Sequence, residues 1–435
     1  MTNCAPEKKK VVIVGGGTAG CIVASQLLRK RDAATALDVT VVDPAEHHFY
    51  QPGWTLVGAG IKPFAWSRRG MDECIPPGAK WVKDAASKLS PDTKTVQLAG
   101  GSSLTYDYLV VAAGLEMNWN FAAGVAENVF KPNSPLVSNY LGGEGTAAAI
   151  ARFPEGGTAI FHAPLGVIKC GGAPHKAAFL SWDYWRSRGR DMAKLNIEFI
   201  HGNKALFHVA HYVPSIKKLF HDRSIATATD MHLKSIEIPP PAGTPAPSNG
   251  APAFEGLATL HDKDGAVVKK PFHMFHVVPP MRAPAVVRDS PLANPAGFVD
   301  VNKKTLQSPR YEDVWAIGDC SALPTSKTAA AIMAQAPVLV HNMLQHMDGR
   351  TPHGEYNGYT SCPLVVGKNP PSLLLMEFDY DLNPAETFPW DQRVAGGIRG
   401  RLHYFMKETV FPAAYWKLAL RGRWFGSNTV FEPSF

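Results

Sequence analysis

The sequence has little charge and few cysteines for its length. Only 19% of its 435 residues are charged, against about 25% in an average soluble protein. A disordered chain needs high charge and low hydrophobicity, so the 45% apolar content excludes that class. Six cysteines are too few for a disulfide-rich secreted scaffold, and a chain of this length buries a core without disulfides. The length itself suggests two or three domains.

The sequence also lacks a long apolar run. A membrane-spanning helix requires roughly 20 predominantly apolar residues, and the best candidate, residues 329–340, is short and interrupted by Gln335 and Pro337. The polar residues 1–10 carry neither the apolar stretch of a secretory signal nor the long Arg- and Ser-rich pattern of a transit peptide. These features favour a cytoplasmic origin.

Short cysteine motifs are missing as well. No C-x-x-C pair occurs, which argues against a zinc ribbon and a thioredoxin site, and no metal site is expected. The C-x4-C dithiol of pyridine nucleotide disulfide reductases is absent too. Any cysteine chemistry must therefore use residues that are distant in the sequence.

The net charge of +7 is concentrated at one end of the chain. Residues 393–425 hold seven basic residues and one acidic residue, so the remainder is nearly neutral. This distribution argues against a nucleic-acid-binding surface. Basic residues among Trp, Tyr and Phe suit a membrane interface. The alternative is a pair of amphipathic helices that cover the protein's own core, and Leu402, Phe405, Met406 and Thr409 follow the required helical spacing.

The chain opens with a dinucleotide-binding pattern. Residues 11–14 form a β-branched run, which predicts a buried parallel strand, and Gly15, Gly17 and Gly20 follow with G-x-G-x-x-G spacing. A helix is expected over residues 21–30 and a second strand over 39–42, which ends at Asp43. The glycines allow a pyrophosphate to approach the backbone, and the acidic residue can bind the adenosine ribose.

Later segments favour FAD over NAD as the nucleotide. Residues 106–114 are typical of the strand that returns beneath the cofactor, and residues 314–319 form a strand that ends in Gly-Asp. Residues 328–332 resemble the helix start that faces the flavin, where the helix dipole would stabilise the reduced anion. The second Rossmann-like unit should begin with a strand at 158–161, but no glycine motif follows that strand. This argues against a nicotinamide nucleotide there.

Two of the six cysteines have chemically suggestive surroundings. Cys170 lies between Lys169 and Lys176 in a Gly- and His-containing segment, and nearby cations lower the pKa of a thiol. Cys362 lies in Tyr-Thr-Ser-Cys-Pro. A small buried hydrophobe remains the alternative for either residue, and only the fold could bring them together.

Several long segments resemble sulfide:quinone oxidoreductases, in particular the group that includes the mitochondrial enzymes and their bacterial relatives. The matching segments span nearly the whole chain: residues 48–52, 54–60, 169–176, 317–320, 323–331, 358–365 and 386–392. The resemblance implies an α/β fold with two Rossmann-like, glutathione reductase-like domains and a C-terminal amphipathic membrane-association region. The expected bounds are residues 8–115 with 290–345 for the FAD-binding domain, 116–289 for the second domain and 346–435 for the C-terminal region.

The resemblance also implies site residues. The expected catalytic residues are Cys170, Cys362 and Lys176. The expected quinone contacts are Phe378, Tyr380, Phe388 and Trp390. The expected FAD contacts are Gly15, Gly17, Gly20, Asp43, Gln51, Pro52, Ala113, Gly114, Gly318, Asp319, Lys327, Thr328 and Ala331. Because no cysteine lies between Cys74 and Cys170, noncovalent FAD is expected.

The implied reaction is FAD-dependent oxidation of hydrogen sulfide through a Cys170–Cys362 redox pair. Hydrosulfide would leave a persulfide on Cys362 and a flavin-facing thiolate on Cys170, with electrons passed to ubiquinone or menaquinone and the sulfur to sulfide, sulfite or a thiol. His175 is a further candidate for proton transfer, with a structural hydrogen bond as the alternative. The location would be peripheral on a membrane, the bacterial plasma membrane being favoured and the mitochondrial inner membrane expected in a eukaryote. The oligomeric state, a homo-oligomer included, stays open.

Three other functions are compatible with parts of the pattern. A non-energy-coupling NADH:quinone oxidoreductase shares the expected fold, but the missing second glycine motif argues against it. A flavocytochrome c-type sulfide dehydrogenase would need export and a cytochrome partner. A redox-sensing flavoprotein without catalytic activity differs from an enzyme only in the chemistry of the cysteines.

Overall fold

The first domain is built on a parallel five-stranded sheet with the order β20–β9–β1–β2–β5. The computed structural model describes residues 8–30 and 36–435. The strands are β1 (Lys9–Val14), β2 (Leu37–Val42), β5 (Lys80–Val82), β9 (Tyr108–Val111) and β20 (Val314–Ala316). Both faces of the sheet are covered, which is why the central strands are continuous apolar runs.

Alternate residues of β1 enter two different cores. Val11 and Ile13 pack with α1 (Thr18–Arg29) and α10 (Ala329–Met347), whereas Val12 and Val14 face a small antiparallel sheet. That small sheet contains β6 (Ala86–Ser90), β7 (Thr95–Leu98) and β8 (Ser103–Thr105). The period of two that a strand imposes therefore sets the layers of this domain.

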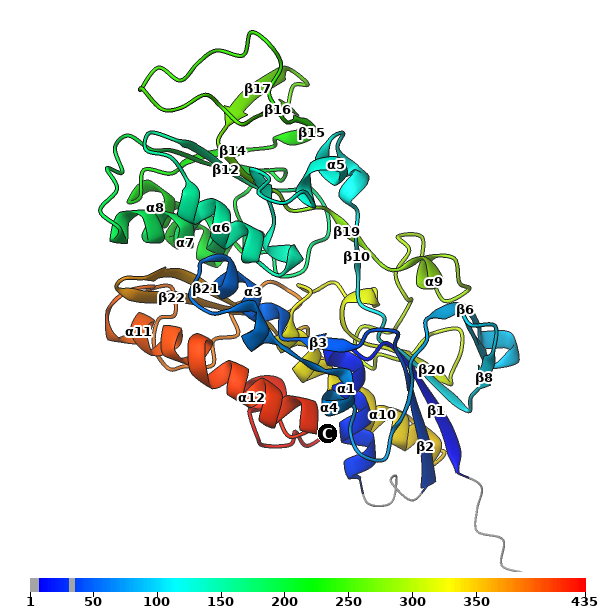
Figure 1. The fold of residues 1–435 in the computed structure, drawn as a ribbon. Coiled ribbons are helices and arrows are strands. Elements are labelled where there is room, and N and C mark those ends of the chain that lie inside the picture. The colour runs from blue at the N-terminus through cyan, green and yellow to red at the C-terminus, as the bar shows by residue number, and fades with distance from the viewer. Residues whose placement is uncertain (1–7, 31–35) are drawn as a thin grey trace, which may run out of the picture.

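The second domain repeats this architecture. Its parallel sheet has the order β11–β18–β12–β13–β14, formed by β11 (Leu136–Val137), β12 (Thr158–Ala163), β13 (Asn196–His201), β14 (Ala226–Thr229) and β18 (Met274–His276). Helices α6 (Glu144–Arg152), α7 (Ala173–Ser187) and α8 (Val213–His221) lie on one side, and the antiparallel sheet β15 (His232–Glu237), β16 (Gly256–His261) and β17 (Val267–Phe272) lies on the other (Figure 1). The proline-rich residues 239–247 form part of the connection between β15 and β16.

The C-terminal region joins the two domains. The antiparallel hairpin β21 (Thr360–Lys368) and β22 (Pro371–Phe378) packs against α7 on one side and α11 (Gly397–Phe405) on the other. A π-helical segment, Met406–Val410, connects α11 to α12 (Phe411–Lys417), and the chain then turns at Ala419–Arg421 beside α1. Figure 1 shows α11 and α12 running in succession from the hairpin towards α1.

Shorter elements complete the chain. They are β3 (His47–Phe49), α3 (Trp54–Gly58), β4 (Arg68–Gly70), α4 (Met71–Cys74), β10 (Glu116–Met117), α5 (Val125–Val129), β19 (Met281–Arg282) and α9 (Ala285–Arg288).

The predicted α/β class with two Rossmann-like units is confirmed. The helix after the glycine motif begins at Thr18 rather than Cys21, because Gly17 already occupies the N-cap position. The predicted bounds of the three regions stay a prediction. Among the described residues, no helix combines the length and hydropathy needed to span a membrane.

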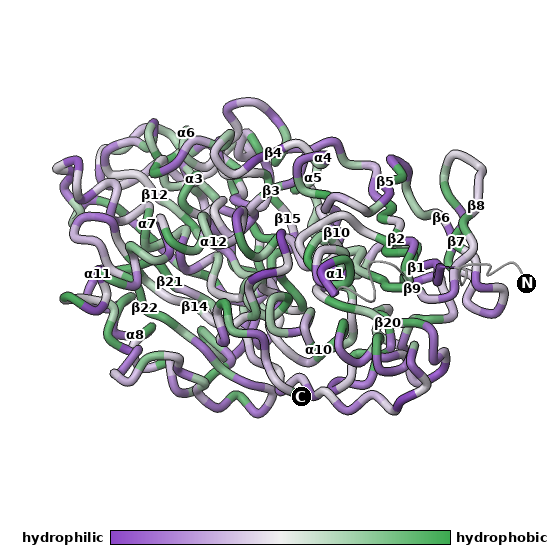
Figure 2. Tube along the Cα trace, turned by 90° about the horizontal axis from the view of Figure 1, so that it is seen from below, coloured by the Kyte–Doolittle hydropathy of each residue, from purple (hydrophilic) through white to green (hydrophobic). Residues whose placement is uncertain are grey.

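The predicted C-terminal helices differ in how they bury their apolar residues. In α12, Tyr415 and Trp416 join the core that surrounds α1. In α11, Ile398, Leu402 and Phe405 are 84%, 42% and 54% exposed. Figure 2, coloured by hydropathy, places α11 at one edge of the molecule. The expectation that the C-terminal helices cover the protein's own core therefore describes α12. Helix α11 instead keeps an exposed apolar stripe.

Candidate active site

A cavity of about 650 Å³ lies where the first domain, the hairpin and the C-terminal helices meet. Its size falls within the range of roughly 300–1,000 Å³ that is typical of ligand and cofactor sites. The glycine loop lines one end, Cys170 and Lys176 line another wall, and Met406, Val410 and Phe411 contribute from the C-terminal helices. One continuous cavity thus contacts the first domain, the second domain and the C-terminal region.

The glycine loop has the geometry of a phosphate cradle. Gly15 has φ +109°, and a Cβ atom there would lie 2.4 Å from the Ala112 carbonyl oxygen. A Cβ on Gly20 would lie 1.8 Å from the Gly15 carbonyl oxygen, so this residue allows helix and strand to pack closely rather than lining the cavity. Gly17 lines the cavity and would place a Cβ in open space. The loop therefore fits a pyrophosphate at the N-terminus of α1.

Asp43 follows the end of β2 and lines the same end of the cavity. Its Oδ2 accepts a hydrogen bond of 2.6 Å from the Gly16 N–H, and its Oδ1 accepts one of 2.8 Å from the Ala45 N–H. Each carboxylate oxygen has a second lone pair. The carboxylate thus orders the glycine loop and keeps the capacity to bind a ribose hydroxyl.

Asp319 lines the cavity near the start of α10. Burial raises the pKa of its carboxyl group, although Lys169 and Lys327 act in the opposite direction. A buried carboxyl of this kind gains from a hydroxyl ligand, as the ribityl chain of FAD would supply. Gly318 lies behind it, at φ +74°, with its N–H bonded to Gln335 Oε1 at 2.9 Å.

The start of α10 also faces the cavity. Thr328 is the N-cap, and its hydroxyl accepts a hydrogen bond of 3.1 Å from the Ala331 N–H. Ala331 therefore has its N–H engaged within the helix and does not line the cavity, whereas Ala329 and Ala330 do. The structure thus places Thr328 of the predicted pair on the cavity wall and Ala331 behind it.

The other predicted FAD contacts also line the cavity. Ala113 and Gly114 follow β9, and Gln51 and Pro52 belong to a short 3-10 turn after β3. Gln51 Oε1 accepts a hydrogen bond of 2.8 Å from Lys169 Nζ, which ties this turn to the segment that carries Cys170. The residues present fit FAD along the cavity, from the glycine loop to the cysteine wall.

The fold brings Cys170 and Cys362 together across 192 positions, with their sulfur atoms 3.4 Å apart. Cys170 lies in the loop between β12 and α7 at φ +52°, a left-handed conformation that is uncommon for a non-glycine residue. Its N–H donates to the Lys327 carbonyl at 2.9 Å, which fixes the loop against the first domain. Cys170 lines the cavity, whereas Cys362 lies behind it, 2% exposed.

The two thiols have opposite pKa shifts. The pKa of Cys170 lies well below the ordinary thiol value because Cys362 donates a hydrogen bond to it and Lys176 adds positive charge, while burial opposes the shift. The same hydrogen bond, together with burial, raises the pKa of Cys362 well above that value. The N-terminus of α7 begins at Ala173 and favours a negative charge on Cys170 as well. The surroundings of Cys170 therefore favour its thiolate form, and those of Cys362 favour its thiol form.

Lys176 is 3% exposed, which excludes a solvated surface lysine. Its Nζ lies 3.3 Å from the Cys170 sulfur. Burial alone would lower the pKa of Lys176, but the neighbouring Cys170 and Cys362 raise it above its ordinary value. The lysine is therefore a buried cation paired with the thiolate.

Lys407 is a cavity residue that the sequence pattern does not reveal, because it belongs to the basic residues of the C-terminal tail. It is 3% exposed, its Nζ donates to the Pro52 carbonyl at 2.8 Å, and it lies over the Tyr50 ring. Burial, with repulsion from Lys176, lowers its pKa to about 7. The π-helical segment turns this residue inward, and no local pattern in the sequence signals that change of register.

The four predicted quinone contacts separate into two groups. Phe388 lines the cavity, and Trp390 stacks on it with ring centroids 4.7 Å apart. Phe378 is 1% exposed in the core of the second domain, and Tyr380 packs against Tyr356. Neither Phe378 nor Tyr380 lines the cavity, since their side chains are committed to packing.

The other cysteines that the structure describes, and His175, are buried in the protein core. Cys21, Cys74 and Cys320 are buried, and Cys4 lies outside the described residues. His175 is fully buried, its Nε2 bonds the Leu206 carbonyl at 2.8 Å, and burial lowers its pKa to about 3. His175 is therefore a neutral structural residue rather than a proton shuttle.

Comparison with known proteins identifies the family of the chain. The family described as pyridine nucleotide-disulphide oxidoreductase matches residues 9–140. The mitochondrial sulfide:quinone oxidoreductase of Dictyostelium discoideum is 39% identical over 426 residues, which cover 98% of this chain and 88% of that protein. The mitochondrial enzyme of Mus musculus is 38% identical over 97% of this chain and 88% of its own length. The chain belongs to the sulfide:quinone oxidoreductase family.

A solved sulfide:quinone oxidoreductase, from Aquifex aeolicus, has the same fold. It superposes with a TM-score of 0.73 over 95% of this chain and 91% of that chain, at 21% identity. The family identity makes this protein an FAD-dependent oxidoreductase that uses quinone as its electron acceptor.

Proposed function

We propose that this sulfide:quinone oxidoreductase oxidises sulfide through the Cys170–Cys362 pair. The observation that carries the proposal is the 3.4 Å separation of two sulfur atoms, one on the cavity wall and one behind it, beside a buried lysine. A disulfide S–S bond is about 2.05 Å long, so oxidation needs only a small approach of the two side chains. Dispersed structural cysteines would not show this pairing.

Hydrosulfide attacks the Cys362 sulfur of the oxidised pair. The bond that forms joins the sulfide sulfur to Cys362 as a persulfide, and the bond that breaks releases Cys170 as a thiolate. The thiol with the lower pKa leaves faster in such an exchange, and the pKa of Cys170 is the lowered one. Lys176 stabilises the departing charge from 3.3 Å.

The persulfide then transfers its outer sulfur to an acceptor such as a thiol, and the cysteine pair returns to the oxidised state by loss of two electrons. FAD, held noncovalently along the cavity by the glycine loop and Asp319, would supply the two-electron acceptor that links the cysteine pair to quinone. With a thiol acceptor, one hydrogen sulfide, one thiol and one quinone give one persulfide and one quinol. Lys407 lines the same cavity, and its pKa of about 7 lets it hold or release a proton at neutral pH.

Anaerobic titration with sulfide tests the proposed activity. We expect sulfide to bleach the flavin absorbance of the purified protein and a short-chain ubiquinone to restore it. NADH should leave the flavin oxidised, because β12 runs into Pro164 and Leu165 without a glycine motif. Reduction by NADH but not by sulfide would instead identify an NADH:quinone oxidoreductase.

The exposed stripe on α11 supports peripheral attachment to the membrane that holds the quinone. Ile398, Leu402 and Phe405 project from one face of the helix, and Arg399 and Arg401 beside them are exposed. Apolar side chains enter the interfacial region of a bilayer while cations meet anionic headgroups. The adjoining residues at this end of the molecule, Met406 to Phe411, include four that line the cavity wall.

Replacement of Ile398, Leu402 and Phe405 by serine should release the protein from vesicles that contain anionic lipid. Each buried methylene contributes about 0.8 kcal/mol to membrane binding, so the vesicle affinity should fall by roughly a hundredfold or more. Sedimentation with vesicles measures this, at several salt concentrations. Serine at Val267 and Phe130, each 59% exposed on the second domain, is the control and should not change binding. Equal binding of both variants would contradict attachment through α11.

A further inference from the structure

Glu377 is a buried acidic residue that lines the cavity, and none of the functions above uses it. It lies near the end of β22, opposite Ser361 on β21, and is 3% exposed. Ser361 and Glu377 both line the cavity. Their strand neighbours Cys362 and Met376 face α7 instead, where both approach Gly172. One face of the hairpin thus carries the Cys362 sulfur, and the opposite face carries the Glu377 carboxylate.

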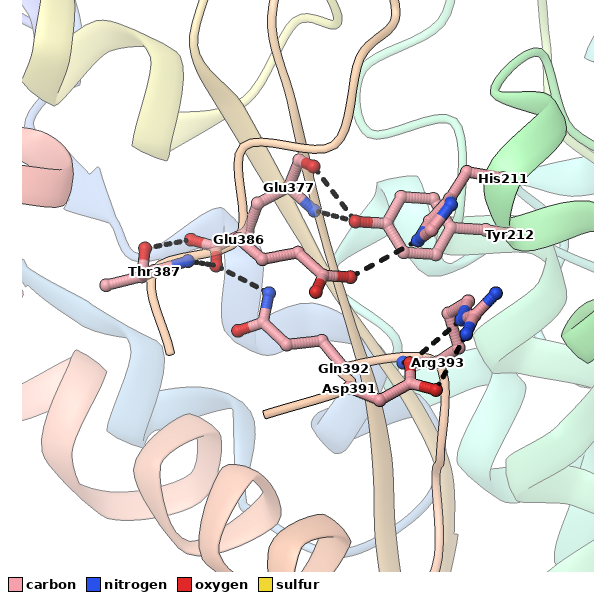
Figure 3. Close-up of polar contacts among 8 residues, drawn as sticks. All are labelled: His211, Tyr212, Glu377, Glu386, Thr387, Asp391, Gln392 and Arg393. Atoms are coloured by element: carbon pink, nitrogen blue, oxygen red, sulfur yellow. Dashed lines mark hydrogen bonds and ion pairs between the residues drawn. The ribbon is translucent and has the colours of Figure 1, made fainter. Parts of the chain in front are cut away.

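The carboxylate of Glu377 accepts hydrogen bonds from four donors. Thr387 donates its N–H to Oε2 at 2.9 Å and its hydroxyl to Oε1 at 2.8 Å. Gln392 donates its side-chain N–H to Oε2 at 2.9 Å, and the Tyr359 hydroxyl donates to Oε1. Figure 3 shows Thr387 and Gln392 converging on this side chain. The four donors occupy lone pairs on both oxygens of the carboxyl group and hold it in one orientation.

The main chain of Glu377 is held as firmly as its side chain. The Tyr212 hydroxyl donates to the Glu377 carbonyl at 2.9 Å and accepts from the Glu377 N–H at 3.0 Å (Figure 3). Tyr212 is fully buried in the second domain. The main chain of Glu377 is therefore fixed, so its carboxylate can hold the residues that donate hydrogen bonds to it in one position.

The segment that Glu377 binds, residues 385–392, is irregular and carries the aromatic wall of the cavity. Phe388 lines the cavity and stacks on Trp390, and both rings pack against His403 of α11. Residues 385–392, all of them described by the structure, belong to no helix or strand. The hydrogen bonds of Thr387 and Gln392 to Glu377, on either side of Phe388, replace the missing secondary structure.

We propose that Glu377 is a positioning residue for the quinone reaction: the hydrogen bonds that its carboxyl group accepts clamp residues 387–392 and so fix Phe388 on the cavity wall. The proposal rests on the proposed function, since it assigns the quinone to the wall formed by Phe388. Glu377 acts through Phe388 and exchanges no electrons with the substrates. The opposite face of the hairpin carries Cys362, so the clamp is separate from the sulfur chemistry.

The substitution Glu377→Gln tests the clamp with almost no change in size. Each carboxylate oxygen accepts two of the four donors. A carboxamide replaces one of these oxygens by an NH2 group, which is itself a donor, so two of the four hydrogen bonds can no longer form as they do now. We expect the KM for a short-chain ubiquinone to rise about tenfold. The rate of anaerobic flavin bleaching by sulfide should stay within about twofold of the unsubstituted protein, since that half-reaction needs no quinone. Amide hydrogen exchange should accelerate in residues 385–392.

Two other acidic residues of the same segment provide matched controls. Glu386 pairs with His211 at 3.4 Å, and Asp391 pairs with Arg393 at 2.9 Å, and both carboxylates are more exposed than that of Glu377 (Figure 3). Glu386→Gln and Asp391→Asn should leave the KM for quinone and the exchange rates unchanged, because the carboxylates of these residues bond His211 and Arg393 rather than Thr387 or Gln392.

Gln392→Leu is a second test of the clamp that leaves Glu377 itself in place. Leucine removes the hydrogen bond of 2.9 Å to Glu377 Oε2 and keeps a side chain of similar size. This variant should reproduce the higher KM for quinone and the faster exchange in residues 385–392, while the rate of bleaching by sulfide stays unchanged.

The outcomes separate the clamp from the proposed function. An unchanged KM for quinone together with unchanged exchange in both Glu377→Gln and Gln392→Leu would overturn the clamp. Slower bleaching by sulfide in Glu377→Gln would overturn it too, because the defect would then lie on the sulfur side. Failure of sulfide to bleach the unsubstituted protein would refute the proposed function, while faster exchange in the variants would still report the clamp.

Discussion

Cys170→Ser and Cys362→Ser should each retain bound FAD and lose sulfide-driven reduction of quinone. A serine hydroxyl cannot form a disulfide or a persulfide at the operating pH, so both the sulfur exchange and the return of two electrons are blocked. Loss of a residue that forms the covalent bond lowers turnover by on the order of a thousandfold or more. Anaerobic stopped-flow measurement of flavin bleaching, with the flavin spectrum as the measure of cofactor content, checks both expectations.

Cys74 offers the control for this experiment. It is 2% exposed in the core around α1, and burial raises its pKa to about 11, so its thiol is unreactive. Cys74→Ala should bleach with sulfide at the unsubstituted rate. Full turnover in Cys170→Ser or Cys362→Ser would remove that residue from the mechanism.

The contrast between Cys74 and Cys170 shows what neighbouring groups do to the pKa of a buried thiol. Burial dominates at Cys74 and raises its pKa to about 11, whereas at Cys170 the Cys362 hydrogen bond and Lys176 outweigh burial and lower the pKa. Both residues lie in largely apolar surroundings. The reactivity of Cys170 therefore depends on two identifiable side chains.

Lys176→Met should slow flavin bleaching by sulfide at pH 7 by roughly a hundredfold, the scale expected when one partner of a buried charge pair is removed. Methionine keeps the length of the side chain and removes its charge. Without the cation the pKa of Cys170 rises, so the thiolate fraction at a fixed pH falls and the leaving group becomes poorer. Alkylation of the reduced protein by iodoacetamide, followed against pH, should show a profile for Cys170 that is displaced to higher pH.

Lys218→Met is the matched control, because the Lys218 side chain is 74% exposed and pairs with Asp222 on the surface of α8. It should change neither the alkylation profile nor the bleaching rate. An unchanged Cys170 profile in Lys176→Met would show that Lys176 does not set the charge of the thiol. The prediction would then fail even if the rate fell for another reason.

The cofactor half of the site could be predicted from the sequence because its chemistry is local. A tight turn, a helix N-terminus and an acidic residue after the next strand are encoded within residues 9–43, and the structure places these features along one wall of the cavity. The exceptions are also local in origin. A motif position points to Ala331 and Gly20, but a hydrogen bond within the helix turn and a close packing contact keep them off the cavity wall.

The part of the cavity that we assign to quinone, around β22 and Phe388, could not be predicted in the same way. Strand alternation in β22 directs Leu375 and Glu377 to the cavity and sends Phe378 into the core of the second domain. An aromatic side chain is equally compatible with either face, so composition alone does not choose between them. Glu377 gave no signal in the sequence, because the donors that surround its carboxylate come from three separate positions along the chain.

Local patterns in the chain are enough to specify the nucleotide-binding frame, the two candidate cysteines and the concentration of positive charge at the C-terminus. Long-range packing, in contrast, makes Cys170 and Cys362 meet, turns Lys407 into the cavity and gives α11 and α12 different amounts of buried apolar surface. The physical reason is the range of the interactions. Turns, caps and glycine clearances act within a few residues, whereas the charge of a thiol and the exposure of a helix face depend on what distant segments place beside them.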